Sequence, residues 1–359
     1  MSNVIRLNVP SQRQSKRDRR AALIASFAQH RRFGDDVFWL KENAELLNIL
    51  ECTGQTLDED ALAPHQGFYA QVEKRMGFFP QYYRFLLSIC LDLEDLGLTG
   101  TKGEALAAWI DRQGLAEAEL SDLQRAEARR LLARRGVTAL EWDTSLTDRL
   151  HRFVNRSETF AMPNKKAAYE LTHIVFYLSE YGRRDPQLDQ AAVTSLEYAG
   201  ILAYLDQNAD LLAEICVALR YAGKTPSQIW EDWLERETHR FTVSTGPQVS
   251  PQDDYHDYFV CNWLMSVSDR DSFTKPAEFD KMSFARAAPY AAPLRDMSET
   301  MFKLEDQRSD DWQVMRPHVE NALSEIGHDI LTEAQMSSDK FESFFAGFAR
   351  TSMQGGVLL

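Results

Sequence analysis

The sequence predicts an all-α protein built as a two-layer helical repeat, either a closed α/α toroid or an open α-solenoid. Apolar residues recur at helical spacing along almost the whole chain. Gly and Pro residues mark short turns between the helical segments. No run of alternating polar and apolar residues after residue 12 indicates a sheet. Nearly apolar helices interspersed with more amphipathic ones are typical of inner and outer layers.

Taken in order, the periodic segments and their Gly, Pro, Asp and Asn boundaries define the expected elements. The predicted helices are Ser15–His30, Val37–Leu50, Asp58–Met76 with a kink at Pro64, Gln81–Leu96, Thr101–Gln113, Ala116–Arg135, Thr144–Thr159, Lys165–Gly182, Leu188–Leu205, Ala209–Ala222, Pro226–Thr238, Asp253–Val267, Pro289–Glu305, Asp310–Leu331 and Ser337–Phe348. Residues 241–252 are predicted to be a loop, and residues 268–288 to be irregular.

The expected organisation is a single large helical domain over residues 15–350. Residues 1–14 form a predicted tail and residues 351–359 a predicted mobile tail. The toroid-like core is expected at about residues 78–268, followed by more polar C-terminal helices at 289–350. Four phenylalanines at helical spacing in the last helix would dock onto the body or onto a second subunit, so a homo-oligomer through the C-terminal helices is one possibility.

Composition restricts the classes of partner. The formal net charge is −14 and the pI about 5.1, which argues against a nucleic-acid binder or a protein of anionic membranes. No apolar run approaches the roughly 20 residues that cross a bilayer. The four cysteines lack CxxC spacing and do not form a disulfide framework. We therefore expect a cytoplasmic protein whose partner is a small-molecule ligand or another protein.

The segment Lys165–Gly182 carries the most distinctive side chains. Asn164 is its expected N-cap and Gly182 its expected C′ residue. One face is apolar, and a second face carries Glu170, His173, Tyr177 and Glu180, at steps of three, four and three residues. This second face has no Lys or Arg, which favours a cavity wall over a solvated surface.

Four helices share a register when they are aligned by their ends. Positions twelve, nine, five and two residues before each end read Phe85, Ser88, Asp92, Asp95; Glu170, His173, Tyr177, Glu180; Leu211, Glu214, Ala218, Tyr221; and His256, Phe259, Trp263, Ser266. In a closed ring these inner faces would converge on one central pocket. His173, Tyr177, Glu214 and His256 should then meet in a single cavity.

Part of the middle of the chain resembles a known family. The segments Tyr169–Gly182, Asp210–Cys216 and Tyr255-His256 are similar to a signature of poorly characterised bacterial proteins with a domain of unknown function. The resemblance covers about residues 165–265. It implies a helical, toroid-like domain and no established activity.

The converging residues allow several kinds of chemistry. His173, Glu214 and His256 could ligate a divalent metal as a two-histidine, one-carboxylate site, although no HExxH motif is present. Without a metal, His173, Tyr177, Glu214 and His256 are candidates for general acid–base catalysis. Alternatively, His173 is a core histidine bonded to Glu170, Tyr177 or a nearby carboxylate.

Two functions therefore stay open at this point. The first is an enzyme that acts on a small molecule in a His-, Tyr- and carboxylate-lined pocket, and the missing Lys and Arg on the inner face favour it. The second is a non-catalytic helical scaffold that binds a protein partner through its concave face or its C-terminal helices.

Overall fold

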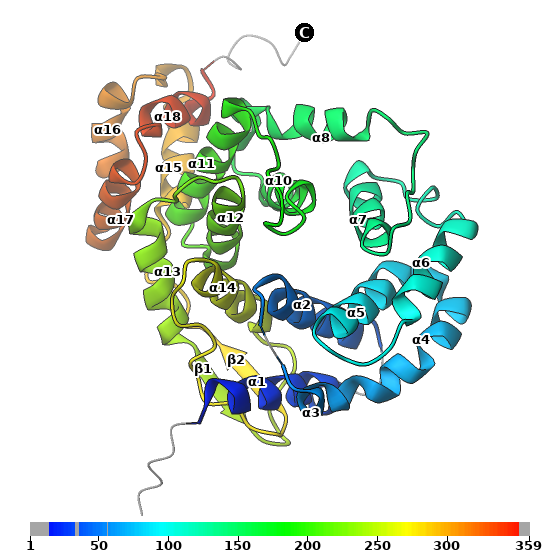
Figure 1. The fold of residues 1–359 in the computed structure, drawn as a ribbon. Helices are drawn as coiled ribbons and strands as arrows, with labels where there is room; N and C mark the ends of the chain where they lie inside the picture. The colour runs from blue at the N-terminus through cyan, green and yellow to red at the C-terminus, as the bar shows by residue number, and fades with distance from the viewer. Residues whose placement is uncertain (1–13, 33–35, 56, 352–359) are drawn as a thin grey trace, which may run out of the picture.

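The computed structural model describes residues 14–32, 36–55 and 57–351, and it is predominantly helical, as predicted (Figure 1). Its helices are α1 (Lys16–Ala25), α2 (Val37–Cys52), α3 (Glu59–Leu62), α4 (Gln66–Phe78), α5 (Tyr83–Asp95), α6 (Lys102–Arg112), α7 (Asp122–Ala133), α8 (Leu146–Val154), α9 (Ser157–Phe160), α10 (Lys165–Leu178), α11 (Gln190–Leu205), α12 (Ala209–Tyr221), α13 (Gln228–Arg240), α14 (Tyr255–Val267), α15 (Pro293–Leu304), α16 (Trp312–Glu320), α17 (Glu325–Met336) and α18 (Phe341–Ala349). Both predicted tails fall almost wholly outside the described residues.

Six helices form a closed ring. Each of α2, α5, α7, α10, α12 and α14 contacts the next in that order, and α14 returns to α2 (Figure 1). The helices α4, α6, α8, α11 and α13 pack on the outside of this ring. Closure corresponds to the toroid rather than to the open solenoid, while a true repeat of the helices stays a prediction.

The ring differs from the predicted core in two places. Helix α2 belongs to it, so the core does not begin at residue 78. Helix α7 has the amphipathic pattern that is typical of an outer layer, but it lies in the ring between α5 and α10. Two of its charged residues, Glu127 and Arg130, line the central cavity.

Several predicted helices are shorter or divided. Pro64 ends α3 and forces a 3₁₀ turn before α4, because its ring cannot continue the helix. The stretch before Asp122 is a turn, so α7 begins six residues later than expected, at the Ser121 cap. Residues 144–159 hold two helices, α8 and α9, and residues 310–331 are divided between α16 and α17.

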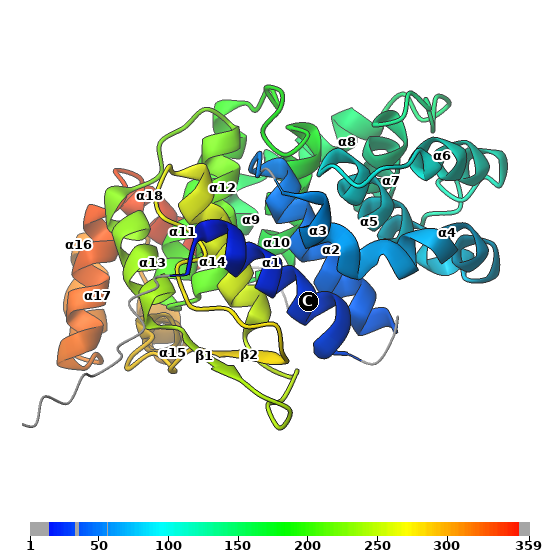
Figure 2. The same cartoon turned by 60° about the horizontal axis from the view of Figure 1, so that its bottom comes forward.

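The predicted loop and irregular segment contain the strands β1 (Thr242–Thr245) and β2 (Met282–Ala285), which pair antiparallel with Thr242 opposite Ala285. Each has only four residues, too few for a clear alternating pattern in the sequence. Figure 2 shows this pair beside α14, and α16 and α17 at the end of the molecule opposite α4 and α6. None of the described helices is long and apolar enough to cross a bilayer.

The C-terminal helices pack on the rest of the chain. Phe341, Phe344, Phe345 and Phe348 of α18 are all buried, and Trp312 of α16 packs against two of them. The apolar stripe thus docks onto the body, one of its two expected uses. It leaves no apolar face of α18 for a second subunit.

Helix α10 begins as predicted and ends earlier. The Asn164 side chain accepts a hydrogen bond from the N–H of Ala167, which caps the first turn. The helix ends at Leu178, and Glu180, Tyr181 and Gly182 follow with φ values of 50°, 53° and 85°. Two consecutive non-glycine residues in the left-handed region store backbone strain. This turn brings the Tyr181 ring back against Phe176 of α10.

Candidate functional site

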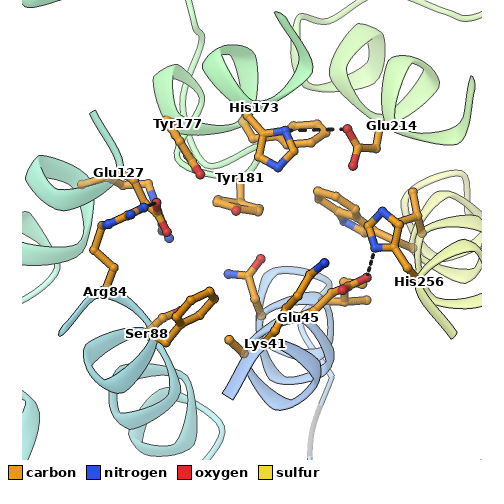
Figure 3. A pocket seen from close by; sticks show the side chains of 18 residues that line it. Lys41, Glu45, Arg84, Ser88, Glu127, His173, Tyr177, Tyr181, Glu214 and His256 are labelled. Carbon is orange, nitrogen blue, oxygen red and sulfur yellow. Dashed lines mark hydrogen bonds and ion pairs between the residues drawn. The ribbon is translucent and has the colours of Figure 1, made fainter. Parts of the chain in front are cut away.

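A cavity of about 210 Å³ lies at the centre of the ring, and side chains from all six ring helices line it (Figure 3). His173 and Tyr177 come from α10, Glu214 from α12 and His256 from α14. The structure therefore brings the four predicted site residues to one cavity although His173 and His256 are far apart in sequence. Ring closure is the physical reason.

His173 is held in one tautomer. Its Nδ1 lies 2.7 Å from the carbonyl oxygen of Tyr169, one turn earlier. A carbonyl oxygen only accepts, so Nδ1 carries the proton and donates it. In the neutral ring Nε2 is then unprotonated, and among the described residues it has no hydrogen-bond partner. Figure 3 shows that nitrogen directed towards the middle of the cavity.

His173 is not the buried core histidine of the alternative interpretation. Its side chain is 37% exposed, and its hydrogen-bond partner is a backbone carbonyl rather than Glu170 or Tyr177. The carboxylate closest to it is Glu214, whose Oε2 lies 3.8 Å from Nδ1. This distance is too long for a hydrogen bond but short enough to stabilise an imidazolium.

Glu214 lies between the two histidines. It is buried and accepts a hydrogen bond from the Thr172 hydroxyl at 2.6 Å. Burial raises the pKa of Glu214, while His173, His256 and the Thr172 hydroxyl oppose that rise. The protonation of this carboxyl group is thus coupled to the charge on both imidazoles.

His256 has the opposite electrostatic setting from His173. Its Nδ1 lies 2.7 Å from Oε1 of Glu45, and its Nε2 lies 3.7 Å from Oδ2 of Asp210. Burial lowers the pKa of His256, but the combined attraction of Glu45, Glu214 and Asp210 is larger and raises it to about 10. His256 is therefore an imidazolium at neutral pH, paired with Glu45.

Aromatic rings form one wall of the cavity. Phe176 lies 4.7 Å from Trp263, and Tyr181 stacks on both rings at 5.8 Å. The strained turn after α10 places Tyr181 there, a contribution that the sequence pattern did not reveal. Tyr177 is buried, burial raises its pKa, and Figure 3 shows its hydroxyl pointing into the cavity.

Several other positions of the predicted inner faces do not line the cavity. Asp92 and Asp95 point away from the cavity and pair with Arg134 at 2.7 and 2.6 Å. Leu211 and Phe259 pack in the core. Seven of the sixteen predicted positions line the cavity, because a helix in a ring presents a narrower arc than one polar stripe.

The predicted absence of cations from the inner face is wrong. Lys41, Arg84 and Arg130 also line the cavity, from helices α2, α5 and α7. Helix α2 was not among the four helices aligned by their ends, so Lys41, Glu45 and Asn48 escaped notice. These three stand at steps of four and three and so share one face of α2, which is the signal that could have found them.

The side chains are not arranged as the predicted metal site. Within residues 14–32, 36–55 and 57–351, no group of three or more His, Cys, Asp or Glu side chains could hold a metal ion. The Nδ1 hydrogen bond of His173 leaves only Nε2 as a possible ligand atom, and His256, protonated on both nitrogens at neutral pH, offers no lone pair to a metal. The described residues do not fit a two-histidine, one-carboxylate centre.

Comparison with known proteins places the chain in a family without assigning it a reaction. A family model described as a domain of unknown function (DUF6902) matches residues 1–351. The chain belongs to this family. The expected relationship to a domain of unknown function is thereby confirmed, and it extends well beyond the middle segment on which it was based. No curated protein and no solved structure matches the chain.

Proposed function

We propose that this DUF6902 protein is an enzyme that performs proton-transfer chemistry on a small molecule in the central cavity. The observation that carries the proposal is the tautomer in which His173 is held. Its Nδ1–H is fixed by the Tyr169 carbonyl, which leaves the lone pair of Nε2 free to accept a proton from a bound molecule. Glu214 supports the imidazolium that forms.

The other predicted residues have complementary roles in this proposal. His256, an imidazolium held by Glu45, stabilises developing negative charge or donates a proton from Nε2. The Tyr177 hydroxyl, which has no hydrogen-bond partner among the described residues, is a second donor. A substrate that loses one proton to His173 and receives one from His256 is isomerised or dehydrated without another reactant. The two rings then exchange their protons with solvent.

The cavity also limits the size of the substrate. A volume of about 210 Å³ is smaller than the roughly 300–1,000 Å³ of typical drug-sized sites. It suits a compact metabolite rather than a peptide. The scaffold alternative loses one of its expected surfaces, because the apolar stripe of α18 is already buried in the chain.

Metabolite profiling tests the proposal even though the substrate is unidentified. Purified protein is incubated with a small-molecule extract, and mass spectrometry records compounds that disappear and isomers or dehydrated products that appear. We expect changes with the unaltered protein and none with His173→Gln. His151→Gln, a half-buried histidine of α8 outside the cavity, is the matched control and should behave as the unaltered protein. Identical profiles for protein and buffer would contradict the proposal.

A further inference from the structure

Among the residues that the structure describes, one buried cation of the cavity has no ion-pair partner. Arg130 of α7 is only 5% exposed, and its Nε and Nη1 atoms are buried without a hydrogen-bond partner. Its guanidinium lies over the Tyr181 ring at 4.6 Å. Cation–π contact fixes the plane of the group but satisfies none of its N–H donors. A buried charged donor without an acceptor is costly, so its presence calls for a ligand.

A second buried donor in the same cavity also lacks a hydrogen-bond acceptor among the described residues. Asn48 of α2 is buried, and its Nδ2 donor has no acceptor among the described residues. Lys41, on the same face nearer the start of α2, is exposed where the cavity opens and forms no ion pair with the described residues. Three sets of donors from two helices thus face one cavity without acceptors.

The carboxylates around the cavity already have partners. Glu45 binds His256, Glu127 binds Arg84, and Glu214 accepts from Thr172. Among the described residues, the lining cations without an ion-pair partner are Arg130 and Lys41, in a protein whose net charge is −14. We propose that the substrate of this cavity is a small carboxylate whose oxygens accept hydrogen bonds from Arg130 and Asn48, with Lys41 at the entrance.

A monoanion fits this site better than a phosphate dianion. Glu45, Glu127 and Glu214 all line the cavity, and their repulsion grows with the charge of the ligand. Guanidinium groups bind carboxylates with short, charge-assisted hydrogen bonds. The rings of Phe176, Tyr181 and Trp263 would cover the apolar body of such a molecule.

Arg130 also faces a neighbouring cavity of about 430 Å³, which Arg129 and Arg184 line. An anion bound there would depend on Arg129, whereas one in the central cavity would depend on Asn48 and Lys41. This difference supplies a control. Arg129→Gln removes a cation of the neighbouring cavity and leaves the central one unchanged.

The test is calorimetric titration of the full chain with acetate, isobutyrate and benzoate, each paired with its neutral amide, and with inorganic phosphate. We expect at least one carboxylate to bind at least tenfold more tightly than its amide. Binding should weaken about 30-fold or more in Arg130→Met, because a desolvated charge pair is lost. It should weaken less in Asn48→Ala and Lys41→Gln and stay unchanged in Arg129→Gln.

Several results would overturn the inference: no carboxylate binding, equal binding of the amides, binding of phosphate alone, or a loss confined to Arg129→Gln. The role of the carboxylate as substrate rests on the proposed function, but its binding does not. Carboxylate binding without turnover would contradict the proposed enzyme activity and support the binding site. His173-dependent turnover without carboxylate binding would support the enzyme activity and contradict the binding site.

Discussion

Two buried arginines of this protein occupy opposite environments. Arg31, which follows the π-helical turn Ser26–His30, is 2% exposed and fully paired. It bonds to Glu42 at 3.1 Å, to both oxygens of Asp253 at 2.8 and 2.9 Å, and to two backbone carbonyls. Arg130 is nearly as buried and has no carboxylate partner among the described residues.

The difference separates structural from functional use of the same residue type. The Arg31 cluster joins the start of the chain, α2, the segment before α14 and β2, so its charges satisfy one another and leave nothing for a ligand. Arg130 is held by ring contacts and leaves donors open beside a cavity. A fully satisfied network stabilises one arrangement of the chain, whereas an unsatisfied one is tolerated where a ligand completes it.

The largest effect is expected at the paired arginine. Arg31→Met leaves the Asp253 carboxylate buried without its cation and leaves Glu42 paired with Arg32 alone, so it should lower the free energy of unfolding by about 3–5 kcal/mol. Chemical denaturation measures this directly. Arg17→Met, which removes an exposed pair with Asp58, is the control and should cost less than about 1 kcal/mol. Equal losses of stability in the two variants would show that the Arg31 cluster does not stabilise the fold.

A smaller loss is expected at the turn that builds the aromatic wall. Gly182 has φ 85°, and a Cβ there would lie 2.5 Å from the Tyr221 ring. Gly182→Ala should therefore cost about 1–3 kcal/mol through strain and displacement of that ring, as measured by chemical denaturation.

Gly223→Ala separates these two causes, because its φ is 68° and nothing lies within 4 Å of the added Cβ. It carries only the backbone penalty and should leave ligand binding intact. A Gly182→Ala variant that matched it in both stability and ligand binding would show that the Tyr221 contact is unimportant.

The pH dependence of stability reports on His256. Its pKa is raised to about 10 in the folded protein, against about 6.5 in an unfolded chain. The stabilisation is thus complete below about pH 6.5 and is lost as the pH rises through about 10. We expect a loss on the order of 1 kcal/mol, because solvent screens a side chain that is 37% exposed.

Glu45→Gln removes the main attraction and should flatten the stability curve between these pH values. His256→Gln should flatten it in the same way. If the pH dependence of stability persisted unchanged in both variants, another titrating group would have to cause it.

The smallest effect is expected at the unpaired arginine. Arg130→Met keeps the packing over Tyr181 and removes a buried charge without an acceptor, so stability should change by less than about 1 kcal/mol or increase. Thermal unfolding without ligand measures it. A loss as large as that of Arg31→Met would mean that Arg130 is structural, and the contrast between the two residues would disappear.

Periodicity and caps in the sequence predict much of this fold because they are local. The Asn164 cap, the apolar face of α10 and the helices α11, α12 and α14 all follow from neighbours within one or two turns. The positions of α2 and α7 in the ring do not, since ring membership depends on contacts between helices distant in sequence. For the same reason, the sequence pattern identified His173 and Glu214 as candidate site residues but did not identify Arg130.

Charge partners are the least predictable feature. Arg31 and Arg130 each stand beside a second arginine in the sequence, and neither pattern indicates which one is paired. The partner Asp253 is more than two hundred residues from Arg31. Asp92 and Asp95 were likewise expected on the inner face, whereas the fold pairs both with Arg134.

The state of His173 can be read from the nitrogen-15 spectrum of histidine-labelled protein across a pH titration, assigned with His173→Gln and His256→Gln. The neutral form of His173 should carry its proton on Nδ1 and show an unprotonated Nε2, while His256 should keep both nitrogens protonated until about pH 10. A neutral His173 protonated on Nε2 could not accept a proton from a molecule in the cavity, and that result would contradict its role as the base.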